Sequence, residues 1–180
     1  RVSSPPNTCP STAVHSTSEA FSRPRSRRHR IRAIVDPMDA RDRVAAARIA
    51  RLATVSGSGQ PHLVPIVFAL DGEVLYTCVD DKPKSTRRLR RLANIADNPR
   101  VSVLVDHYDD DWSRLWWVRI DGIATVHDAD SVAGAVGLDT LARKYAQYQS
   151  KRPTGPVITI ERLRWRSWSA RTQAGGDEKS

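Results

Sequence analysis

The chain has 180 residues, of which 39% are hydrophobic and 27% charged, and its formal net charge is +9. This is an ordinary composition for one globular domain with a modest core, and it argues against two domains. No apolar run approaches the roughly 18 residues that span a bilayer, so we expect no integral membrane protein.

The positive charge is concentrated at the N-terminus. Residues 1–36 carry seven arginines against Glu19 and Asp36, whereas the remaining residues are only mildly basic. This leader is rich in Ser, Pro and Arg without periodicity, so we expect disorder there and again over residues 171–180. It also resembles an organellar transit peptide, and the simpler alternative is an over-extended N-terminus ahead of Met38, the only methionine. Binding of polyanions by 23–32 remains open, but the body argues against nucleic acid as a partner.

The two cysteines indicate the redox compartment. Cys9 lies in the polar leader and Cys78 in an apolar run, so a disulfide is not expected. A reducing cytoplasm is the simpler interpretation.

The ordered domain is expected over residues 37–170 and begins with a helix. Asp36 and Pro37 suit the N-cap and first position of a helix over 37–51. Asp71-Gly72 between apolar runs predicts a hairpin. A second helix begins near Ser85, and a third covers 129–148. Strands are predicted over 52–56, 60–70, 73–79, 100–106, 115–127, 157–161 and 163–169. This pattern predicts a mainly β (α+β) protein, a split β-barrel of six or seven antiparallel strands with two to three helices.

The turn before the second helix carries the strongest chemical signal. Lys82, Lys84 and Arg88 surround Ser85, a natural N-cap, and no acid lies in the first turns. Cations near a helix N-terminus are disfavoured by the macrodipole unless an anion binds there. Free backbone N–H groups and these side chains would cradle a phosphate. A merely solvated basic face is the alternative, most of all for Arg90 and Arg91.

Other catalytic and metal motifs are weak. The sequence contains no Walker A or Gly-x-Gly-x-x-Gly pattern and no arrangement for covalent catalysis. The histidines are scattered. Asp109, Asp110 and Asp111 follow His107 and could hold a divalent cation, but a charged surface loop is the favoured interpretation. We therefore predict no metal site and name no catalytic residue.

Five tryptophans accompany only two phenylalanines. Trp116 and Trp117 are adjacent in a predicted strand and must point to opposite faces. One can enter the core, and the other needs a dimer partner or a ligand ring to cover it. Two packing residues remain as good an explanation as a cofactor contact.

The ordered set of segments resembles the pyridoxamine 5′-phosphate oxidase-like split-barrel superfamily. The set comprises Gly-Gln-Pro-His-Leu-Val-Pro (59–65), the Asp-Gly hairpin, Leu-Tyr-Thr (75–77), the Lys-rich turn, and Asn-Pro-Arg with Val-Ser-Val-Leu-Val (98–105). Within it, the segments 106–112 and 115–119 are similar to the actinobacterial branch that uses the deazaflavin coenzyme F420.

The resemblance implies a homodimer with two cofactor sites at the subunit interface. It implies that the tricyclic ring lies near His62, Val64, Pro65 and Thr77. The phosphate-binding turn aligns with Lys82, Lys84 and Ser85, with Arg88 as a plausible addition, and the partner contributes from the strand of Trp116 and Trp117.

The predicted function is transfer of a hydride between reduced F420 and an electron-poor small organic substrate. The arginine-lined groove suits the acidic tail of F420 better than it suits FMN. Two alternatives stay open: an FMN-binding oxidase or reductase of the same fold, and a non-catalytic protein that binds or carries F420.

Overall fold

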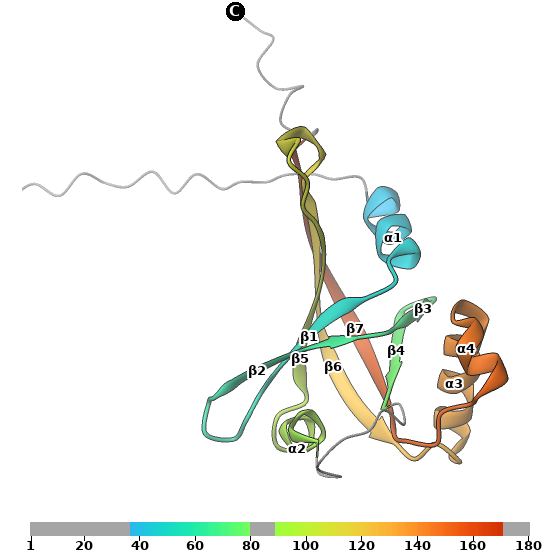
Figure 1. Cartoon of the computed structure of the whole chain (residues 1–180). Helices are drawn as coiled ribbons and strands as arrows, with labels where there is room; N and C mark the ends of the chain where they lie inside the picture. The colour runs from blue at the N-terminus through green and yellow to red at the C-terminus, as the bar shows by residue number, and fades with distance from the viewer. Residues whose placement is uncertain (1–36, 80–88, 171–180) are drawn as a thin grey trace, which may run out of the picture. The chain divides into compact units, whose positions relative to one another are not determined.

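A computed structural model describes residues 37–79 and 89–170 of the chain (Figure 1). The described residues form one antiparallel sheet of seven strands in the order β2-β1-β5-β6-β7-β4-β3. The mainly β class and the strand count predicted from the sequence are confirmed. The strands are β1 (Ala50–Val55), β2 (Pro61–Ile66), β3 (Ala69–Asp71), β4 (Val74–Cys78), β5 (Arg100–His107), β6 (Trp116–His127) and β7 (Val157–Ser169).

The two edge strands of this sheet are neighbours in the sequence. β2 ends at Ile66 and β3 begins at Ala69, so only Val67 and Phe68 separate opposite edges. Three peptide steps reach at most about 11 Å, and the sheet must therefore curl into a half-barrel. The predicted single strand over 60–70 is wrong here, because its two parts pair at opposite edges.

The hydroxyl of Tyr145 holds the short link, Val67–Phe68, that joins the two edge strands. Tyr145 is buried, and its oxygen accepts from the backbone N–H of Phe68 at 3.1 Å. The same oxygen lies 2.7 Å from the carbonyl oxygen of Arg48 and 2.8 Å from that of Phe68, and its one proton can donate to either of them. Residues 67–68 are thereby tied to the C-cap residue of the helix that ends at Lys144 and to Arg48, two residues before β1.

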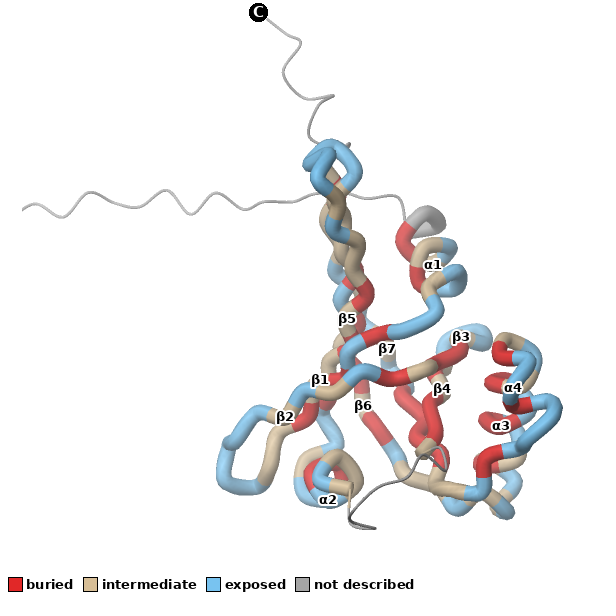
Figure 2. Tube along the Cα trace, viewed as in Figure 1, coloured by how far each residue is buried: buried red, intermediate tan, exposed pale blue. Residues whose placement is uncertain are grey.

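Alternation along the strands separates a buried inner face from an outer face (Figure 2). On β1, Leu52 is fully buried and pairs with Val103 of β5 and Val64 of β2. The same core includes Ile120 of β6 and Ile160 of β7. Helix α1 (Pro37–Ala46) adds Ala40 and Val44 to this core, and α2 (Arg90–Asp97) adds Ile95.

β7 is one strand of 13 residues, whereas the sequence predicted two over 157–161 and 163–169. Its pairing with β6 shifts by one residue between Asp121 and Ile123, which marks a β-bulge. Arg162 has a φ of 53° at this place. A bulge interrupts alternation without ending the strand, and this explains the incorrect break.

Two helices differ from their predicted bounds. α1 ends at Ala46 rather than 51, since the chain from Ala50 pairs with β2 and β5. α2 begins at Arg90 with Leu89 as its N-cap, and Ser85, near which the sequence predicted its start, lies outside the described residues.

The helix predicted over 129–148 is divided. α3 (Val132–Lys144) and α4 (Ala146–Ser150) meet at Tyr145, whose φ of −121° and ψ of 105° are extended. The described residues therefore contain four α-helices where two to three were predicted, and one 3-10 turn, η1 (Trp112–Arg114).

α3 and α4 lie against the outer side of β3 and β4 (Figure 1). They form a second core cluster, in which Leu138 and Leu141 pack with Val157 of β7. Cys78 is buried in this cluster, consistent with a packing role. In the described ranges no helix has the length and apolar character that a bilayer crossing requires.

Lys144 is the exceptional polar group of this region. Its buried Nζ has no hydrogen-bond partner among the described residues and lies 4.1 Å from the ring centroid of Phe68. Burial, followed by the positive charge of Arg48, lowers the pKa of Lys144 from 10.5 to about 8. The ammonium form is therefore disfavoured in the folded state.

Replacing Lys144 by methionine is expected to remove a pH dependence of stability. The unfolded lysine keeps its proton up to about pH 10.4. Between about pH 8 and that value the unfolded state binds more protons, so the free energy of unfolding of the natural chain rises with pH. Chemical denaturation at pH 7.5 and 9.5 should show this rise, which K144M should lack. The exposed Lys151→Met variant is the control and should retain it. An equal rise in K144M and K151M would contradict the assignment.

Candidate cofactor site

Strand β2 divides the residues predicted to contact the ring between two faces. His62 and Val64 pair with buried residues of β1 and lie on the inner face. Pro65 lies on the outer face with Leu63. Thr77 of β4 points inward. A planar ring that binds on one face of a single chain can contact either the inward residues His62, Val64 and Thr77 or the outward Pro65. It cannot contact both.

His62 lies beside the start of α2. Its Nδ1 is 3.5 Å from the hydroxyl of Thr54, to which Asn94 Nδ2 donates at 2.9 Å. Partial burial, and then the positive charges of Arg90 and Arg91, lower the pKa of His62 below its usual 6.5. The imidazole is therefore mainly neutral at pH 7, at a place where two guanidinium groups add positive potential. No carboxylate among the described residues contributes to this shift.

Thr77 carries an unpaired polar atom. The residue is 1% exposed, and its Oγ1 has no hydrogen-bond partner among the described residues. Buried hydroxyl groups in proteins are normally bonded. This hydroxyl is therefore available to a bound molecule, close to the end of β4.

The residues predicted to hold a phosphate, Lys82, Lys84, Ser85 and Arg88, lie outside the described residues. The helix that follows them is described from Arg90. Its first turn contains no acid, and no side chain caps it. The described start of α2 thus retains the basic, acid-free character noted in the sequence.

The two adjacent tryptophans lie on opposite faces, as predicted. Trp116 packs against the inner core, where the Arg43 guanidinium lies 5.2 Å and the His107 ring 6.1 Å from its ring centroid. Trp117 is half-buried on the outer face and pairs with Trp168 of β7. The two indoles therefore do not serve one common surface of the same chain.

The outer face carries a groove of about 260 Å³ that crosses β1, β5, β6 and β7. Arg100 and Arg164 lie in its lining together with Asp121. Ser102 donates to Asp121 at 2.6 Å, which holds this carboxylate in place. Sequence reasoning named none of these residues, although alternation in β5 and β6 placed Ser102 and Asp121 on the outer face.

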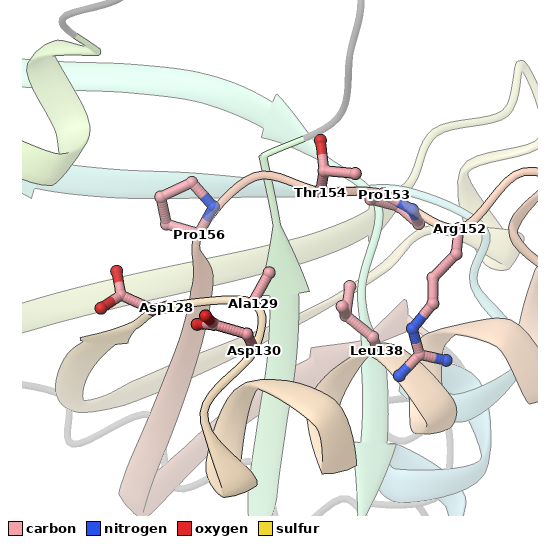
Figure 3. A pocket seen from close by; sticks show the side chains of 8 residues that line it. All are labelled: Asp128, Ala129, Asp130, Leu138, Arg152, Pro153, Thr154 and Pro156. Carbon is pink, nitrogen blue, oxygen red and sulfur yellow. The ribbon is translucent and has the colours of Figure 1, made fainter.

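A larger cavity of about 570 Å³ opens between the β6–α3 connection and the residues before β7 (Figure 3). Asp128 and Asp130 face it from one side, and Leu138 forms part of its wall. The guanidinium of Arg152 forms an ion pair with Asp139. The acidic rim is unsuited to a phosphate, and none of the predicted site residues within 37–79 and 89–170 lines this cavity.

The acidic loop after β5 is a charged surface loop. Asp109 Oδ2 lies 3.1 Å from Arg114 and 3.6 Å from Nε2 of His107. Asp111 caps η1 by accepting from the backbone N–H of Ser113 at 3.0 Å. Over residues 37–79 and 89–170 no three His, Cys, Asp or Glu side chains form a metal-binding group.

The family model described as pyridoxamine 5′-phosphate oxidase matches residues 37–169. The chain belongs to the pyridoxamine 5′-phosphate oxidase family. The resemblance stated from the sequence is thus confirmed, and the family match covers the whole described sheet.

Solved structures similar to this family member share its fold at low identity. A conserved hypothetical protein of Mycobacterium tuberculosis is 22% identical with a TM-score of 0.62, over 82% of this chain and 92% of the other. The heme storage protein HutZ of Vibrio cholerae is 13% identical with a TM-score of 0.58, over 74% and 93%. An FAD-binding protein of Mesorhizobium loti is 21% identical with a TM-score of 0.52, over 75% and 96%.

A curated relative shares a shorter segment with this family member. It is the 5a,11a-dehydrotetracycline/5a,11a-dehydrooxytetracycline reductase of Streptomyces rimosus, 39% identical over 56 residues. The match covers 31% of this chain and 38% of the reductase. The similarity is limited to about a third of each protein.

Proposed function

We propose that the chain is an oxidoreductase that binds F420 and transfers a hydride between the reduced cofactor and an electron-poor small organic substrate. The observation that carries the proposal is the positive potential at the start of α2, where the charges of Arg90 and Arg91 lower the pKa of His62. F420 bears a phosphate and an acidic glutamate tail, and the positive potential at the start of α2 would attract such a polyanion. The part-length similarity to a reductase of a polycyclic substrate supports the same reaction class.

The described residues fit a flavin-like group of this charge. The unpaired hydroxyl of the buried Thr77 offers a donor and an acceptor near the end of β4. His62, largely neutral at pH 7, offers either a donor or an acceptor according to its tautomer. Lys82 and Lys84 add charge in sequence between β4 and α2.

When bound, F420 would supply the hydride chemistry. The roles of the chain's own residues are to bind, orient and exclude water. Arg90 and Arg91 attract the anionic part, Thr77 fixes one polar atom, and Val64 provides an apolar contact. We assign no catalytic acid, and a proton from water completes the reduction of the substrate.

We further propose that the protein is a homodimer that pairs through the outer face. Leu63 is 63% exposed there, and Trp117 and Trp168 are half-buried. Exposed apolar groups on one sheet face are typical of an interaction surface. A second copy would cover them and bring its own Trp117 to the groove that contains Arg100 and Arg164.

Parallel titration of the full chain with F420 and with FMN tests the proposed cofactor. Binding is followed through tryptophan fluorescence. We expect F420 to bind more tightly, and Lys84→Ala to weaken it about tenfold or more, because a charge-assisted contact is lost. Arg143→Gln on α3 is the matched control, since Arg143 pairs with Asp71 away from the site.

Each outcome separates the alternatives. Preference for FMN would keep the family and replace the cofactor. Tight binding of F420 without reduction of any member of a panel of quinones, nitroaromatics and unsaturated ketones would favour a carrier. If neither cofactor bound, the proposal that the protein is an oxidoreductase would be contradicted.

A further inference from the structure

A separate pocket of about 200 Å³ lies at the end of β5 that is remote from α2. Its lining residues come from α1, β5, η1, β6 and β7. Arg43 comes from α1, His107 from the end of β5, and Arg114 from η1. Trp116 begins β6, and Ser169 ends β7. A site assembled from segments this far apart in sequence depends on the complete fold.

The lining of this pocket is basic. Within the described part of the chain it contains two guanidinium groups and an imidazole but no carboxylate. Asp109, which is outside the lining, lies 3.1 Å from Arg114 and 3.6 Å from Nε2 of His107 and orients both side chains. The guanidinium groups have further N–H donors, whose planar arrangement matches a carboxylate or phosphate.

A hydroxyl group adds a neutral donor to these cations. Ser113 lines the pocket, but its hydroxyl donates to Asp111 at 2.7 Å. Ser169 also lines the pocket and is only 3% exposed. Its hydroxyl can add a neutral hydrogen bond to an oxyanion that the guanidinium groups attract.

Trp116 limits the size of that ligand. Its ring is flanked by Arg43 at 5.2 Å and by His107 at 6.1 Å with an interplanar angle of 20°. Arg43 and His107 thus both pack on this ring, so the pocket presents cations rather than an open aromatic face. A volume of about 200 Å³ suits a small oxyanion better than a second flavin.

We propose that this pocket is a binding site for a small oxyanion, a carboxylate or a phosphoryl group, held by Arg43, Arg114 and Ser169. It lies on the inner side of the ribbon formed by β5, β6 and β7, whereas Trp117 and the proposed dimer surface lie on the outer side. It is also at the opposite end of β5 from α2, where the cofactor is proposed to bind. The site is therefore independent of the cofactor site.

The test is a titration of the ¹⁵N-labelled full chain with inorganic phosphate and, separately, with acetate. Sodium chloride keeps the ionic strength constant. The readout is the indole N–H signal of Trp116, assigned with the Trp116→Phe variant. We expect saturable binding of at least one oxyanion. Arg114→Gln and Arg43→Gln should each weaken it about tenfold, and Ser169→Ala about threefold, as expected for lost charged and neutral hydrogen bonds.

Arg143→Gln again serves as the control, because it removes an exposed, ion-paired arginine elsewhere. Its affinity should stay within about twofold of the natural chain. Saturation with phosphate alone would define a phosphoryl site, and saturation with acetate as well would define a general oxyanion site. A linear shift that is equal in every variant would overturn the proposal. Thermal unfolding of each variant separates loss of binding from loss of fold.

Discussion

Replacing Gly134 by alanine is expected to destabilise the folded chain by about 2 kcal/mol net. A Cβ at this position would lie 2.0 Å from the backbone carbonyl oxygen of Asp128. Alanine is favoured over glycine inside a helix by about 1 kcal/mol, but this gain is smaller than the cost of moving a backbone segment. The steric cost therefore exceeds the gain in helix propensity, and the alanine variant is the less stable protein.

The segment that would have to move also caps α3. Ser131 accepts from the backbone N–H of Gly134 at 3.0 Å and donates to the carbonyl of Asp128 at 2.7 Å. Displacing Asp128 would disturb both hydrogen bonds, and we expect urea denaturation to show a lower midpoint at unchanged slope.

Gly57→Ala is the matched control for this variant. Its Cβ would meet only the side chain of Asp97, at 3.4 Å from Oδ2, which is an ordinary contact. We expect a change in the free energy of unfolding within about 0.5 kcal/mol. If the two alanine variants were equally stable, the close approach at Gly134 would be wrong.

The elements that the sequence predicted well are those in which local chemistry and long-range pairing agree. Val101, Val103 and Val105 alternate along β5, and all three are buried as expected. Asp71-Gly72 lies at the β3–β4 turn, with Gly72 at a φ of 57°. Neither feature requires knowledge of the rest of the chain.

The elements that were predicted poorly from the sequence depend on pairing with distant segments of the chain. Residues 47–51 continue a helical pattern, yet Ala50 and Arg51 pair with β2. The division at Val67–Phe68 appears only when the sheet closes on itself, because the local pattern of a long strand is unbroken there. Tertiary pairing outweighs local propensity at both places.

The candidate site was predictable by residue type but not by face. Alternation alone indicates that His62 and Pro65 lie on opposite sides of β2, yet the resemblance grouped them around one ring. The groove residues Ser102 and Asp121 required the register of β5 with β6. Positive charge at the start of α2 was visible in the sequence, whereas its effect on His62 depends on the packing of α2 near β2.

Leu63→Lys is expected to weaken dimerisation about tenfold or more without unfolding the chain. Leu63 lies on the outer face of the edge strand β2 and is 63% exposed, so a lysine there meets no buried group within one chain. In the proposed dimer the same position is covered by the second copy, where an unpaired ammonium would be desolvated. Sedimentation equilibrium over a range of concentrations measures the change.

Val132→Lys is the control, because Val132 is 85% exposed on α3, which packs on β3, β4 and β7 and not on β2. Its dimerisation should match that of the natural chain. A monomeric natural chain, or equal dimerisation of L63K and V132K, would contradict the proposed interface.

Titration of L63K with F420 then shows which face of β2 the cofactor contacts. Loss of binding would indicate that the partner completes the site beside Pro65, whereas unchanged binding would place the cofactor on the inner face, with His62 and Thr77 of one chain.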